Sequence, residues 1–61
     1  MKVFVNNGFY KHTSDLNKEI NKKLEDLITK YGATILSCTV QYVEYSWNFG
    51  SKYNYVITYE E

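Results

Sequence analysis

The stretch ATILSCTVQYVEYSWNF at residues 33–49 contains no Gly and no Pro. It is rich in β-branched and aromatic residues, which predicts a single long strand. A strand of roughly 15 residues reaches about 50 Å at ~3.3 Å per residue, whereas a helix of about 18 residues spans only about 27 Å. The far end of such a strand must project beyond a helix of this size, curl strongly, or pack on another subunit. We favour another subunit.

The apolar pattern of this stretch changes midway. Apolar residues fall on even positions first and on odd positions later: Leu36, Cys38, Val40 and Tyr42, then Val43, Tyr45, Trp47 and Phe49. A regular strand would place the two sets on opposite faces of a sheet. A bulge near Tyr42–Val43 would instead bring them onto one curved core face. The sequence leaves both alternatives open, as well as which face a helix covers.

A helix is predicted before this stretch, at Ser14–Tyr31. Its apolar residues repeat at helical spacing: Leu16, Ile20, Leu24, Leu27, Ile28 and Tyr31. Ser14 is a candidate N-cap and Gly32 a candidate residue for ending the helix in a left-handed conformation.

Two further elements complete the predicted fold. KVFV at Lys2–Val5 predicts a strand that ends in a turn at Asn6–Gly8. NFG at Asn48–Gly50 predicts a hairpin loop with Gly50 in the left-handed conformation. That loop sets a register: Trp47 with Ser51, Tyr45 with Tyr53 and Val43 with Tyr55, sharing a face with Ile57 and Tyr59.

The expected fold class is therefore α+β, in the order β-α-β-β. One helix packs on a three-stranded, mainly antiparallel sheet, and residues 1–61 form a single domain. The helical connection permits parallel pairing of the first two strands or a flanking position for the first strand.

Composition excludes several classes of function. With one Cys (Cys38) and one His (His12), the chain can form neither an internal disulfide nor a four-ligand zinc site. A net charge of zero disfavours nucleic acid as a partner. No apolar run suggests a signal peptide or a membrane span, and a free thiol suits the cytoplasm. His12 is expected to be solvated and Cys38 to be a buried, inert thiol, so we expect no enzyme, cofactor or metal.

The order of elements resembles two groups of small bacterial proteins. "KVFV", the helix to Tyr31 and the two following strands resemble the dodecin family, flavin-storing βαββ proteins that form hollow shells. Dodecins place a flavin-stacking Trp early in the second strand, where this chain has Ile35 or Leu36, so no flavin ligand is carried over. "KVFV" and "DLNKEINKKLEDL" also look like the opening strand and helix of a sporulation-associated family of Bacillota.

The aromatic residues near the C-terminus are the candidate site. As interface or ligand-stacking residues we select Tyr45, Trp47, Tyr53, Tyr55 and Tyr59. The preferred hypothesis is a non-enzymatic protein-interaction module that self-associates, most simply as a homodimer, and binds another protein. The absence of Arg and Pro is typical of AT-rich genomes, which suggests a phage-encoded inhibitor of a host defence protein. The alternative is a dodecin-like oligomer that holds a small aromatic or nucleotide-type ligand between subunits.

Overall fold

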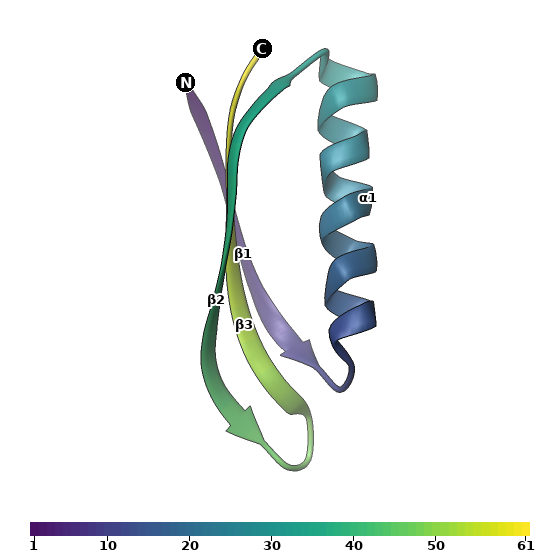
Figure 1. The fold of residues 1–61 in the computed structure, drawn as a ribbon, viewed down its shortest axis with the longest axis vertical. Helices are drawn as coiled ribbons and strands as arrows, with labels where there is room; N and C mark the ends of the chain where they lie inside the picture. Colours follow the sequence, from purple (N-terminus) through teal and green to yellow (C-terminus); the bar gives the residue numbers. More distant parts are fainter.

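The computed structural model describes residues 1–61 and confirms the β-α-β-β order (Figure 1). The elements are β1 (Lys2–Tyr10), α1 (Thr13–Tyr31), β2 (Thr34–Ser46) and β3 (Gly50–Glu60). The sheet has three strands in the order β1-β3-β2, and both pairings are antiparallel. The first two strands therefore do not pair with each other. They flank β3, the last strand in the sequence.

Strand β1 is longer than predicted, because it continues through the expected turn at Asn6–Gly8. In the sheet Asn6 lies opposite Tyr55 and Gly8 lies opposite Tyr53. Asn favours turns because its side chain can bond to nearby backbone groups, and Gly favours them because it tolerates positive φ. Here β3 supplies a partner strand along the whole of β1, and this pairing overrides the local preference.

Helix α1 begins one residue earlier than predicted and ends as predicted. The N-cap residue is His12 rather than Ser14, and no side chain caps the first turn. Gly32 has φ 63° and its N–H donates to the carbonyl of Ile28, at an N···O distance of 3.1 Å. This is the left-handed C-terminal cap that glycine adopts without steric cost.

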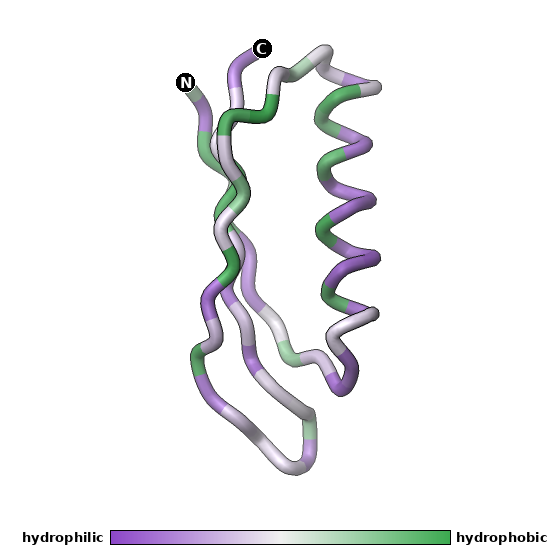
Figure 2. Tube along the Cα trace, viewed as in Figure 1, coloured by the Kyte–Doolittle hydropathy of each residue, from purple (hydrophilic) through white to green (hydrophobic).

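The core lies between α1 and the central strand β3. The fully buried residues come mainly from these two elements: Leu16, Ile20, Leu27, Ala33, Tyr55 and Ile57. Figure 2 shows the hydrophobic positions of α1 on the side that faces the sheet. Three of the predicted helix residues are thus core residues, whereas Ile28 and Tyr31 are exposed.

The pairing of β2 with β3 is interrupted by two register shifts, at Leu36 and at Val43. The second is the bulge that the sequence offered as one alternative. It places Tyr42 opposite Tyr53 and, after Val43 is skipped, Tyr45 opposite Ser51. Because paired residues lie on the same face, Tyr42 and Tyr45 both lie on the helix side of the sheet.

The predicted hairpin register is wrong by two residues at the tip. The loop consists of Trp47, Asn48 and Phe49, and Ser46 pairs with Gly50. Gly50 has the expected positive φ, 96°, but it is the first residue of β3 rather than part of the loop. A Cβ at Gly50 would lie 2.5 Å from the carbonyl oxygen of Tyr10, so β1 approaches the hairpin too closely for any other residue.

Candidate interaction surface

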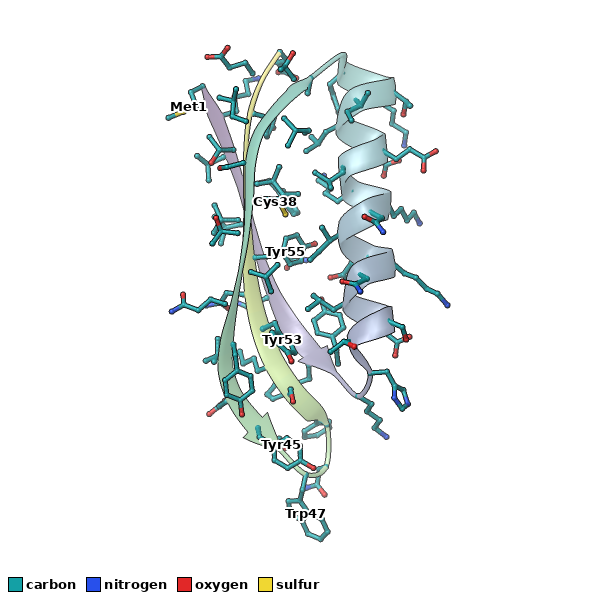
Figure 3. The ribbon with its side chains drawn as sticks, viewed as in Figure 1. Met1, Cys38, Tyr45, Trp47, Tyr53 and Tyr55 are labelled. Carbon is teal, nitrogen blue, oxygen red and sulfur yellow. The ribbon has the colours of Figure 1, made fainter.

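The structure separates the five predicted site residues by depth (Figure 3). Tyr45 is 65% exposed and Trp47 is 85% exposed. Tyr53 and Tyr59 are partly buried and pack against the core. Tyr55 is only 1% exposed, so its side chain is part of the core and not of the exposed surface.

Tyr55 lies in the middle of the central strand, beneath α1. The Asn6 amide donates a hydrogen bond to the Tyr55 hydroxyl, at 3.3 Å, and the ring of Phe4 lies 6.0 Å from its ring, centroid to centroid. Burial raises the pKa of Tyr55, because the charged form would lose its hydration. A buried tyrosine whose hydroxyl has a partner stabilises a fold and is inaccessible to a ligand.

Tyr53 connects the buried and the exposed aromatic residues. On one side its ring lies 6.5 Å from that of Tyr10, and on the other 5.7 Å from that of Tyr42. The Tyr10 hydroxyl donates to the Glu19 carboxylate of α1. Burial and then this carboxylate raise the pKa of Tyr10. Tyr10 and Tyr53 are thereby held against the helix, whereas Tyr42 lies beyond its cover.

Three of the exposed aromatic residues lie in the β2–β3 hairpin and form what we call the hairpin surface: Tyr42, Tyr45 and Trp47. All three are exposed, and the hairpin projects beyond the first turn of α1 (Figure 1). Tyr42 was missing from the predicted site, although the change in apolar pattern at Tyr42–Val43 was the signal for it. Because of the bulge, Tyr42 and Tyr45 lie on the same face of the sheet.

The opposite face of β2 is polar, which removes one reason for expecting two apolar sheet faces. Its residues on that side pair with residues of β3 that alternate with Tyr55 and Ile57: Ser37, Thr39, Gln41 and Glu44. Two exposed valines of β1 lie on the same side, Val3 and Val5. Phe9 and Phe49 pack together there with ring centroids 5.7 Å apart, and the Lys52 ammonium lies 5.6 Å from the Phe9 ring.

His, Cys, Asp and Glu do not gather in groups of three or more that could hold a metal ion, and the surface has no pocket. Cys38 was expected to be buried but is exposed, because α1 does not cover the part of β2 that carries it. No helix here is long and apolar enough to cross a bilayer.

Comparisons of this chain with family models, with curated proteins and with solved structures found no match. The hairpin surface must therefore be interpreted from its own geometry. What it offers is aromatic area on a projecting edge, without a pocket or a group of metal-binding side chains.

Proposed function

We propose that this chain is a non-enzymatic protein-interaction module that self-associates through the hairpin surface. The observation that carries the proposal is the exposure of three neighbouring aromatic side chains, Tyr42, Tyr45 and Trp47, at 55%, 65% and 85%. Isolated apolar residues are common on protein surfaces, whereas contiguous patches mark sites of interaction. Tyr and Trp are also the residues that most often dominate binding energy at protein interfaces.

The exposed area is about half of what one partner contributes to a standard interface. At ~200 Å² for each aromatic side chain, the hairpin surface leaves roughly 400 Å² accessible. A standard interface buries about 800 Å² on each partner, so these three residues account for about half of one partner's share. The rest can come from apolar residues next to them, among which Val40 and Val43 are exposed.

Sedimentation equilibrium at micromolar concentration tests this proposal. We expect a dimer of about twice the 7.2 kDa chain mass. The double variant Tyr45→Ala with Trp47→Ala should sediment as a monomer and keep its helical circular dichroism, because each truncation removes ~2 kcal/mol or more of interface energy from residues that are exposed in the chain.

A matched control removes exposed apolar area elsewhere. Val3 and Val5 are 55% and 62% exposed on the opposite face, at the other edge of the sheet. The variant Val3→Ala with Val5→Ala should remain a dimer. A monomeric wild-type protein would refute the proposal, as would a control variant that dissociates while the hairpin variant does not.

A further inference from the structure

The middle of the outer edge of β2, residues 37–42, lacks the features that normally keep an edge strand from pairing. Sheets protect such edges with lysines, prolines, bulges or a covering helix. Between Thr34 and Ser46 the only charged residue is Glu44, and there is no proline. The two register shifts, at Leu36 and Val43, leave residues 37–42 in regular register. The middle of this edge is therefore uncharged, regular and exposed.

The other edge of the sheet, β1, is covered on the helix side. The Lys23 ammonium lies 4.2 Å from the centre of the Phe4 ring, and Glu19 accepts the hydrogen bond from Tyr10. Both contacts join one flank of α1 to β1. The partly buried residues Phe4 and Tyr10 contrast with Val40 of β2, which is exposed on the same face of the sheet.

The opposite flank of α1 faces toward β2 and is apolar near its C-terminal end. At 3.6 residues per turn, Ile28 lies far round the helix from Glu19 and Lys23, on the side away from β1. Ile28 is 51% exposed and Tyr31 is 60% exposed. The end of the molecule opposite the hairpin thus has exposed apolar side chains of its own, which Leu36 at the start of β2 extends.

We propose that a second copy of this chain occupies this surface by antiparallel pairing of the two β2 edges about a two-fold axis near Val40. The axis stands perpendicular to the sheet, so the joined sheet has six strands with both helices on one side. The inference rests on the proposed self-association and adds its geometry. Across the axis Val40 lies opposite its own copy, and Cys38 lies opposite the partner's Tyr42.

Self-pairing explains why apolar residues are exposed at both ends of the molecule. Because Val43 and Leu36 are skipped, Tyr45 and Ile35 are each four paired positions from Val40, about 13 Å along the strand in opposite directions. Two-fold pairing therefore brings the hairpin surface of each copy to the level of Ile28 and Tyr31 of the other. A partner of another kind would have to match both ends separately, whereas a second copy matches them by symmetry.

The charges on β2 are compatible with this arrangement. Because Val43 is skipped, Glu44 is three paired positions from Val40, so it lies opposite the partner's Ser37 and far from the partner's Glu44. No like charges meet across the pair. The pairing thus satisfies the free backbone groups of the edge without burying a charge against its own copy.

An isotope-filtered nuclear Overhauser experiment on a dimer mixed from labelled and unlabelled chains tests the geometry. We expect intermolecular contacts between backbone protons of residues 38–42, and between the Trp47 ring and the methyl groups of Ile28. A dimer with intermolecular contacts at Trp47 but none along the β2 backbone would overturn the edge pairing and leave the proposed function standing. A wild-type monomer would overturn both.

A pair of lysine substitutions provides the matched control. Thr39 and Val5 lie opposite Val56 on its two sides, on the same face of the sheet, and both are exposed. Thr39→Lys places two like charges diagonally across the proposed axis and should raise the dimer dissociation constant on the order of fivefold or more. Val5→Lys should leave it unchanged. Equal effects, or a larger effect of Val5→Lys, would contradict pairing through β2.

Discussion

Tyr55 and Tyr45 are the same residue type, 10 positions apart in one hairpin, and they have opposite roles. Tyr55 lies in the central strand, buried under α1 with a hydrogen bond from Asn6. Tyr45 lies in an edge strand beyond the end of the helix (Figure 3) and is 65% exposed. Residue type does not distinguish them, whereas strand order does. We call β1, β3 and α1 the covered half of the molecule, because they supply most of its core. We call β2 with its hairpin loop the uncovered half, because most of its residues are exposed.

Two adjacent helix residues provide the strongest test of this division. Leu27 is 2% exposed and Ile28 is 51% exposed. Leu27→Asp should unfold the chain, because an unpaired buried carboxylate costs more than a marginally stable small domain can lose. Ile28→Asp should leave the fold intact. Circular dichroism and thermal melting of the two variants measure this, and an unfolded Ile28→Asp monomer would mean that the covered half is larger than described.

Truncating the two tyrosines gives a graded version of the same comparison. Tyr55→Ala should lower the free energy of unfolding by ~3–5 kcal/mol, as expected for a large buried aromatic side chain. Tyr45→Ala should change the stability of the monomer by less than ~1 kcal/mol. Urea unfolding at the lowest usable protein concentration measures the stability of the monomer alone. Similar losses in both variants would place Tyr45 in the core.

Alkaline pH should weaken the covered half through its tyrosines. The pKa values of Tyr10 and Tyr55 are raised above the ordinary 10.0 in the folded chain, so above that pH the unfolded chain loses protons that the folded chain keeps. The free energy of unfolding should therefore be insensitive to these groups below pH 10 and fall as the pH rises further. Tyr10→Phe should reduce the fall, measured by urea midpoints on either side of pH 10. An equal fall in both proteins would contradict this origin.

Trp47 offers the mildest and most specific test of the uncovered half. It is the only tryptophan, and it is 85% exposed in the chain. If a second copy covers the hairpin surface, the fluorescence emission of Trp47 should shift to shorter wavelength as the protein concentration rises. The Thr39→Lys variant should need a higher concentration for the same shift. If the emission wavelength is the same in dilute and in concentrated protein, no second copy covers Trp47.

Features of the fold that depend on contacts between residues close in sequence could be predicted, whereas features that depend on distant residues could not. The spacing of Leu16, Ile20 and Leu27 identified the buried face of α1, and Gly32 identified its end, because both depend on contacts within a few residues. The turn expected at Asn6–Gly8 is absent, since strand β3, more than forty residues away in sequence, pairs with that segment. Local propensity carries no information about such a partner.

The candidate site was only partly predictable for the same reason. Tyr45 and Trp47 were selected as interface or ligand-stacking residues and are exposed, whereas Tyr55 was selected with them and is buried. The one-residue bulge at Val43 decides which aromatic residues share a face. Its presence could be suspected from the change in apolar pattern, but its effect on the register depends on how the loop at Trp47–Phe49 closes, which alternation alone does not specify.

The central place of β3 also affects the order in which the chain can fold during its synthesis. On the ribosome β1, α1 and β2 emerge before β3, yet both sheet pairings require β3. Until then only the helix can form, while β1 and β2 remain unpaired and the apolar side of α1 remains uncovered. Pairing of β1 with β3 then closes a long loop, which slows folding relative to local contacts. The sheet can therefore form only after β3 has been synthesised.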